Sequence, residues 1–215
     1  MPKRKRFVQT FFTRHCLFHQ AMTETEERLI RRAQQGNLAA FEQLVALHDR
    51  QVLKLAFHLL SRREDAEDVY QEIFVLVFRK IGTFRFESEF STWLYRIVVN
   101  TCINYRKKRS RERFYSLESP LAEDEEPERR YQIAAPEVDP ERAAMNRELG
   151  QKISEAIASL SEQQRAVFVL RHFHGHKLQD IAAILSCAEG TVKNYLFRAT
   201  QHMQQKLRAY HEGSL

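Results

Sequence analysis

The C-terminal part of the sequence carries polar and aromatic side chains at a spacing suited to reading base pairs. A short apolar helix over residues 179–185 is followed by a tight turn over 186–189 and by a second helix that begins at Gly190. This is helix-turn-helix spacing, in which the second helix presents its first residues to the major groove, with Val192 and Leu196 facing inward. The outward positions carry groups that can pair with guanine, adenine or phosphate, or contact a thymine methyl group: Thr191, Lys193, Asn194, Phe197 and Arg198.

A second group of residues suits single-stranded nucleic acid. Over residues 84–113, aromatic side chains alternate with cations and amides. Unpaired bases stack on aromatic faces while cations neutralise the phosphates. Helical spacing assigns Trp93 and Leu94 to a core. The remaining candidates for contact with unpaired bases are Phe84, Arg85, Phe86, Phe90, Arg96, Asn100 and Asn104.

An acidic helix lies between these two groups and the N-terminus. Asp65, Asp68 and Glu72 recur on one face, with Gln71 beside them. No histidine is near enough in sequence to complete a metal or acid–base site. Acids near a helix start also favour the helix dipole, so a solvated face and a docking face for a basic partner both remain open.

Three alternating histidines, His172, His174 and His176, form the other cluster that could bind a metal. No cysteine or carboxylate pair completes a ligand set nearby. We therefore expect no metal and no cofactor, and an inter-helix turn whose imidazoles face phosphate.

The elements that position these residues are predicted to be helices. With 6 glycines and 5 prolines the chain has few of the turns that a sandwich or barrel needs, and its 43% apolar content suffices for one or two cores. Asn37 is a predicted N-cap, and three capping boxes are predicted at 23–26, 61–64 and 161–164. The expected fold class is all-α, with helical domains over 23–112 and 143–215 joined by a flexible acidic linker over 113–142.

Charge and cysteine content limit the function classes. Most of the net charge of +6 comes from residues 1–21, which contain no acid. Residues 1–22 are either a basic arm or translated upstream sequence, with Met22 as the true start. The unpaired Cys16, Cys102 and Cys187 indicate a reduced, cytoplasmic protein, and no apolar run is long enough for membrane insertion.

Taken in order, these motifs resemble a known family. DAEDVYQEIF, then FRFESEFSTWLYRIVVNTCINY, then LSEQQRAVFVLR and IAAILSCAEGTVKNYLFRA, are similar to the sigma-70 family of bacterial RNA polymerase specificity subunits. More narrowly they resemble its extracytoplasmic-function (ECF) group, which retains regions two and four only. The resemblance covers residues 23–207 in the expected order.

The resemblance implies roles for residues at matching positions. The acidic helix would dock on the core polymerase (β′ and β subunits) through Asp65, Asp68, Gln71, Glu72 and Phe74. The aromatic loop from Phe84 to Phe90 would hold a flipped base of the −10 element, with Arg96, Asn100 and Asn104 along the strand. The helix-turn-helix, with Arg171 added, would read the −35 element. An anti-sigma factor is an expected partner, and no catalytic residue is implied.

Departures and alternatives remain. Tyr70 stands where the family usually has a small aliphatic residue, and residues 177–180 replace the usual Ser-Tyr-Glu-Glu. The main alternative is a dimeric helix-turn-helix regulator that reads a palindrome. A histidine-centred metal hydrolase and an RNA-binding helical protein are weaker alternatives.

Overall fold

The computed structural model describes residues 26–117 and 140–212. Throughout these two ranges the only regular elements are helices, which confirms the all-α class. The first set of helices is α2 (Glu26–Gln34), α3 (Leu38–Leu60), α4 (Arg63–Lys80), the short 3-10 helix η1 (Ile81–Thr83) and α5 (Phe90–Leu117). The second set is α6 (Pro140–Ala158), α7 (Glu162–His172), α8 (Leu178–Leu185) and α9 (Glu189–Glu212).

Local capping explains several of these helix starts. The side chain of Asn37 accepts a hydrogen bond from the backbone N–H of Ala40 at 2.9 Å, which confirms the predicted cap of α3. The predicted capping box at Ser161 is also present at the start of α7. The box predicted at 61–64 is wrong: Ser61, at φ +65°, ends α3, and α4 starts after Arg62 without a side-chain cap. The box at 23–26 lies almost wholly outside the described residues.

Helix α3 is the centre of the first set and contacts α2, α4 and α5. Because its apolar residues recur every three or four positions, they form one inward face. The residues that the periodicity predicts to be inward are all buried: Phe41, Leu44, Val45, Val52, Leu55, Ala56 and Leu59.

The second set surrounds α7 and α9. Helix α9 contacts α6, α7 and α8, and its inward positions Val192, Ala199 and Met203 are buried. Val167 and Leu170 of α7 are completely buried. The helix-turn-helix is thus held by buried side chains that it shares with α6 and α7.

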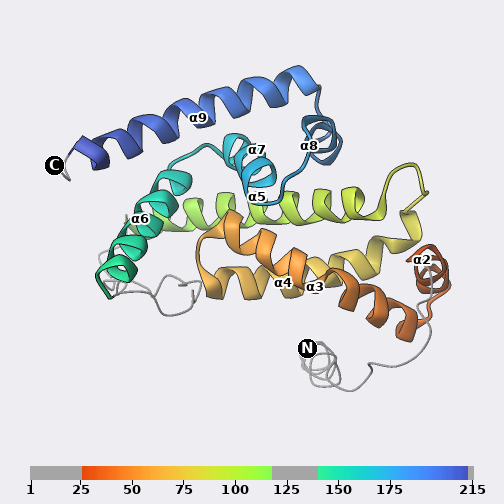
Figure 1. The fold of residues 1–215 in the computed structure, drawn as a ribbon. Coiled ribbons are helices and arrows are strands. Elements are labelled where there is room, and N and C mark those ends of the chain that lie inside the picture. Colours follow the sequence, from red (N-terminus) through yellow and green to blue (C-terminus); the bar gives the residue numbers. More distant parts are fainter. Residues whose placement is uncertain (1–25, 118–139, 213–215) are drawn as a thin grey trace.

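The two sets also touch each other. Helix α5 runs across the middle of the molecule, with α3 and α4 on one side and α7 and α8 on the other (Figure 1). Helix α8 contacts α5, helix α7 contacts α3, and one cluster of buried apolar side chains extends through both sets. The described part of the chain is therefore a closed arrangement of two helical domains.

The acidic residues of the predicted linker lie mostly at 118–139, outside the described ranges. Helix α5 continues past the basic run to Leu117 and α6 begins at Pro140, so both ends of the predicted linker are helical. Within the described residues, every helix is too short or too polar to cross a lipid bilayer.

Candidate nucleic-acid interface

Both helices of the helix-turn-helix begin within one residue of their predicted starts, α8 at Leu178 and α9 at Glu189. Helix α8 ends at Leu185. Ser186 follows it at φ +53° and turns the chain, and the Ser186 backbone N–H donates to the carbonyl oxygens of Ala182 and Ala183. The carbonyl oxygen of Ala188 accepts hydrogen bonds from the N–H groups of Thr191 and Val192 at 2.9 and 3.2 Å. These contacts fix the start of α9 one short turn after α8 ends.

The first two turns of α9 expose the predicted base-reading groups. Lys193, Asn194, Phe197 and Arg198 are exposed, and Thr191 is partly exposed. Phe197, at 63%, is the most exposed large apolar side chain of the described residues. At this position the ring is accessible to an apolar group in a groove, such as a thymine methyl group.

Lys193 and Arg171 have intramolecular partners. The Lys193 ammonium lies 2.8 Å from the Glu189 carboxylate, with 61% of the lysine side chain exposed. Arg171, at the end of α7, donates to the His176 carbonyl oxygen at 3.0 Å. Because exposed ion pairs contribute little, Lys193 can exchange its partner for a base or a phosphate at small cost.

The aromatic loop between η1 and α5 forms a packed cluster. Ring centroids of Phe84, Phe90 and Trp93 lie 5.4–5.5 Å apart, and Phe86 lies 4.9 Å from Phe84. The Gln34 amide donates to the carbonyl oxygens of Ile81 and Phe84 at 3.0 and 2.8 Å. Helix α2 therefore holds this loop in place.

Only part of this loop can meet a base in this structure. The sequence predicts Phe84 and Phe90 as pocket residues, but they are 5% and 4% exposed because they pack on Trp93 and on each other. Arg85 is exposed, and Phe86 is 37% exposed at φ +59°, with the Arg31 guanidinium 4.5 Å above its ring. Phe84 and Phe90 thus support the loop, whereas Arg85 and Phe86 form its surface.

The face of α5 that carries Arg96, Asn100 and Asn104 follows the helix at intervals of four residues. Asn100 and Asn104 are exposed. Arg96 is partly exposed and donates to the Ala183 carbonyl oxygen of α8 at 2.6 Å. The closed arrangement thus brings one predicted −10 residue onto the predicted −35 domain.

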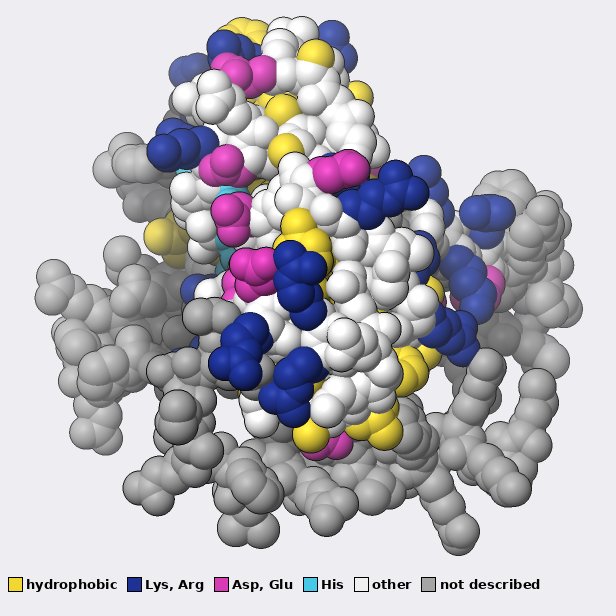
Figure 2. Space-filling model, turned by 90° about the vertical axis from the view of Figure 1, so that its right-hand side faces the viewer, with side chains coloured by type: hydrophobic (Ala, Val, Ile, Leu, Met, Phe, Trp, Pro, Cys, Tyr) yellow, Lys and Arg dark blue, Asp and Glu magenta, His cyan; other side chains and the backbone are white. Residues whose placement is uncertain are grey.

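Charge on this end of the molecule is mixed. Figure 2 views the end where α2 and α8 lie, and Lys and Arg side chains there alternate with Asp and Glu side chains and with hydrophobic patches. Since no single basic field covers this face, affinity for a phosphate backbone depends on individual side chains.

The predicted docking residues of α4 divide between surface and core. Asp68, Gln71 and Glu72 are exposed together on one face. Phe74 is 8% exposed and packs edge-on against Tyr70, with ring centroids 4.9 Å apart. Only the first three can meet a partner without rearrangement.

Asp65 differs from its predicted role. It is 8% exposed, accepts a hydrogen bond from the Tyr105 hydroxyl at 2.7 Å, and pairs with the guanidinium of Arg109. The Arg62 guanidinium lies 3.7 Å away. Asp65 therefore joins α4 to α5, and Arg109 of the basic run faces inward rather than toward a nucleic acid.

Replacing Asp65 with asparagine should lower the free energy of unfolding by about 2 kcal/mol, because a partly buried guanidinium loses its counter-charge. Chemical denaturation followed by circular dichroism measures this loss. The matched control is Asp68→Asn, an exposed acid one turn away, for which we expect a change within about 0.5 kcal/mol. Equal stability of the two variants would contradict a structural role for Asp65.

The histidines at the end of α7 and after it form an inter-helix turn as predicted, and His172 is exposed, but the other two face the first helical set. His174 and His176 are partly buried against the first helical set, where His174 meets His58 and His176 meets Tyr95. Within residues 26–117 and 140–212, no group of three or more His, Cys, Asp or Glu side chains is arranged so that it could hold a metal ion.

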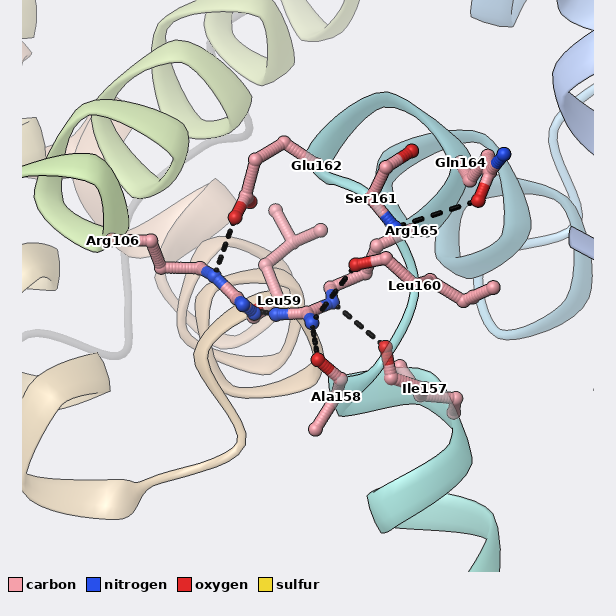
Figure 3. A network of polar contacts seen from close by, with 9 residues as sticks. All are labelled: Leu59, Arg106, Ile157, Ala158, Leu160, Ser161, Glu162, Gln164 and Arg165. Atoms are coloured by element: carbon pink, nitrogen blue, oxygen red, sulfur yellow. Dashed lines mark hydrogen bonds and ion pairs between the residues drawn. The ribbon is translucent and has the colours of Figure 1, made fainter. Parts of the chain in front are cut away.

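Sequence reasoning missed a polar cluster at the junction of the two sets. Arg165 is 1% exposed and donates to carbonyl oxygens of Ile157, Leu160 and Leu59 at 2.9, 3.3 and 3.2 Å, and to Ala158 (Figure 3). Arg106 of α5 also donates to the Leu59 carbonyl oxygen and pairs with Glu162 at 3.0 Å. One feature of the sequence could have indicated that Arg165 is buried: it lies on the apolar face of α7, one turn before Val169.

Comparisons with known proteins agree with this geometry. Residues 44–112 match the family described as Sigma-70 region 2, and residues 150–203 match Sigma-70, region 4. The ECF RNA polymerase sigma-E factor of Haemophilus influenzae is 38% identical over 85% of this chain and 95% of its own length. The RNA polymerase sigma-H factor of Pseudomonas aeruginosa is 34% identical over 86% of this chain and 94% of its own length.

A solved structure shares the fold. The sigma factor RpoE from Bartonella quintana, in complex with the anti-sigma factor NepR, has a TM-score of 0.58 and 26% identity, and the match covers 78% of this chain and 96% of that one. The region 2 match falls on the first set of helices, and the region 4 match falls on the second set, which contains the helix-turn-helix. The chain belongs to the sigma-70 family, in its ECF group.

Proposed function

We propose that this chain directs core RNA polymerase to specific promoters by holding two DNA elements with two helical domains. As a member of the ECF group it is a transcription initiation factor and not an enzyme. The observation that carries the proposal is the presence, in one chain, of an exposed base-reading helix and a separate aromatic loop beside an acidic helix face.

The helix-turn-helix is proposed to read the −35 element. Thr191, Lys193, Asn194 and Arg198 offer hydrogen-bonding groups, and Phe197 offers an apolar surface. Arg171, at the end of α7, is proposed to contact a phosphate near the same groove. Phosphate contacts position a protein on the duplex, whereas contacts with base edges specify the sequence.

The loop and α5 are proposed to hold the −10 element. A base that leaves the duplex loses a few kcal/mol of stacking, so a protein must offer a replacement surface. Arg85 and Phe86 are accessible for this, with Phe84 and Phe90 supporting the loop from beneath. Asn100 and Asn104 continue along the strand, and Arg96 joins them once its contact with Ala183 is released.

The acidic face of α4 is proposed to dock on the β′ and β subunits of the polymerase core. Asp68, Gln71 and Glu72 are its accessible residues, while Phe74 and Asp65 hold the helix in position. An anti-sigma factor is proposed as a second partner, since the solved relative RpoE is bound to one. A cytoplasmic location follows from these partners.

Reversing the charge of Asp68 should weaken binding to core polymerase about tenfold, because a lysine repels a basic docking surface. Biolayer interferometry of Asp68→Lys against immobilised core polymerase measures this change. The control is Glu148→Lys, an exposed acid on α6, which should bind like the wild type. Unchanged affinity of Asp68→Lys would remove α4 from the docking surface.

Reconstituted transcription tests the function as a whole. We expect the purified chain to bind promoter DNA weakly, and to give run-off transcripts from its own promoters when core polymerase is added. The dimeric regulator makes the opposite prediction, namely tight binding to a palindrome without polymerase. Polymerase that gains no initiation activity from the chain would overturn the proposal.

A further inference from the structure

The two helical domains are joined by side chains that could report on solution conditions. On one side of the contact are His58 of α3 and Tyr95 of α5. On the other side is the turn between α7 and α8, which contributes Phe173, His174 and His176. Imidazole is the only side chain whose ordinary titration falls between pH 5 and 8.

These side chains form one continuous cluster. His58 Nδ1 lies 3.2 Å from His174 Nε2, and the His58 ring also packs on Phe173 with centroids 4.5 Å apart. His174 and His176 are stacked with their ring planes 12° apart. His176 meets the Tyr95 ring edge-on at 5.2 Å.

The His58–His174 contact requires a deprotonated nitrogen. One ring nitrogen must donate and the other must accept, so both rings cannot be protonated while the hydrogen bond exists. The contact joins one residue of each domain, and the two residues are 116 positions apart in sequence. Protonation of both rings would place two like charges at hydrogen-bond distance.

The surroundings also disfavour protonation in the closed form. Burial, with the Lys54 cation of α3 adding to it, lowers the pKa of His58 to about 4. Burial also lowers the pKa of His174 to about 4, with positive charge on His58, His176 and Lys54 acting in the same direction. Burial lowers the pKa of His176 as well, although the Asp180 carboxylate of α8 opposes this change.

We propose that the His58–His174 pair is a proton-sensitive latch between the two domains, which holds the closed form when neutral and releases it on acidification. Opening would free Arg96 from the Ala183 carbonyl oxygen and separate α8 from α5. The proposal concerns the isolated chain, and it does not depend on the polymerase or DNA contacts proposed above.

The direction and size of the effect follow from proton linkage. At about pH 7.5 both imidazoles are mostly neutral in either form. As the pH falls below the ordinary histidine value, only the open form takes up protons, so the closed form loses stability until the pH reaches the lowered values near 4. Between about pH 7.5 and 5.5 the ratio of open to closed molecules should rise about tenfold for each imidazole released.

Single-molecule energy transfer measures the two populations directly. Dyes are placed on Gln43→Cys of α3 and Gln204→Cys of α9, both exposed, in a chain whose natural cysteines are replaced. We expect an open population that grows at least tenfold from about pH 7.5 to 5.5. Small-angle scattering of the unmodified chain, which needs no cysteine replacement, should show a larger radius of gyration at the lower pH.

Glutamine variants separate the latch from other effects of acid. The double variant His58→Gln and His174→Gln keeps a hydrogen-bonding pair that does not titrate and leaves only His176 to take up a proton at the contact, so its open population should respond to pH at least tenfold less than that of the wild type. The matched control His202→Gln removes an imidazole that bonds Ser159 within the second set, and it should respond like the wild type. A wild type that stays closed, an equal response from the double variant, or loss of helical circular dichroism on acidification would overturn the proposal.

Discussion

Replacing Arg165 with alanine will lower the free energy of unfolding by about 3 kcal/mol, the largest stability effect we expect for a single substitution in this chain. Arg165 is 1% exposed, yet within the described residues its hydrogen-bond partners are backbone carbonyl oxygens rather than carboxylates. Its guanidinium instead donates to the last carbonyl groups of α6 and to the C-terminal end of α3 (Figure 3).

The physical reason lies in helix termini. The last four carbonyl groups of an α-helix have no partner within the helix, and they form the negative end of its dipole. Arg165 satisfies several of these groups at once, and two helix ends supply the negative potential that its buried charge needs. Alanine would leave buried acceptors without donors, and the cost of an unsatisfied buried group is about 1–3 kcal/mol.

Urea denaturation followed by circular dichroism measures this prediction. Arg198→Ala is the matched control, since Arg198 is exposed on α9, and we expect its stability to stay within about 0.5 kcal/mol of the wild type. Arg165→Lys should fall between the two, because lysine keeps the charge but loses the planar fork of donors. A loss for Arg165→Ala that matches the Arg198→Ala control would contradict the assigned role.

The largest functional effect should come from the first turns of α9. The double variant Lys193→Ala and Asn194→Ala should reduce transcription from a promoter with an intact −35 element about 100-fold, since each base contact contributes about 1–3 kcal/mol. Both residues are exposed, so folding should be unaffected. Run-off transcription on matched promoters measures the loss.

Its controls lie in the same helix and in the promoter. Lys206→Ala removes an exposed cation near the other end of α9, and transcription should change no more than about twofold. On a promoter with a scrambled −35 element, the double variant and the wild type should be equally weak. A 100-fold loss on both promoters would place these residues outside base recognition.

Much of the fold was accessible from local sequence. The Asn37 cap, the capping box at Ser161 and the end of α8 at Leu185 were predicted correctly, because each depends on residues within one turn of the chain. Helical periodicity also identified the inward face of α3 and the outward face of α9. Ser61 was assigned to the wrong helix, because a residue between two helices can serve as the end of one or the start of the next.

The sites were predicted less completely than the helices that carry them. Periodicity states which side of a helix a residue lies on, but a residue at the edge of the apolar face is buried or exposed according to what packs there. Asp65 is buried because Arg109 and Tyr105 reach it from α5. Phe84 is buried because Phe90 and Trp93 of α5 pack on it. Each of these partners comes from another helix.

The sequence by itself determined the helical class, the helix-turn-helix and the family, because these depend on the spacing of nearby residues and on the order of motifs along the chain. Only the tertiary structure decided that Arg165 is a buried junction, that Arg96 contacts α8 and that His174 meets His58. These contacts join residues 87 to 116 positions apart, and no local pattern encodes which distant polar groups will meet. They depend on how two independently patterned sets of helices pack against each other.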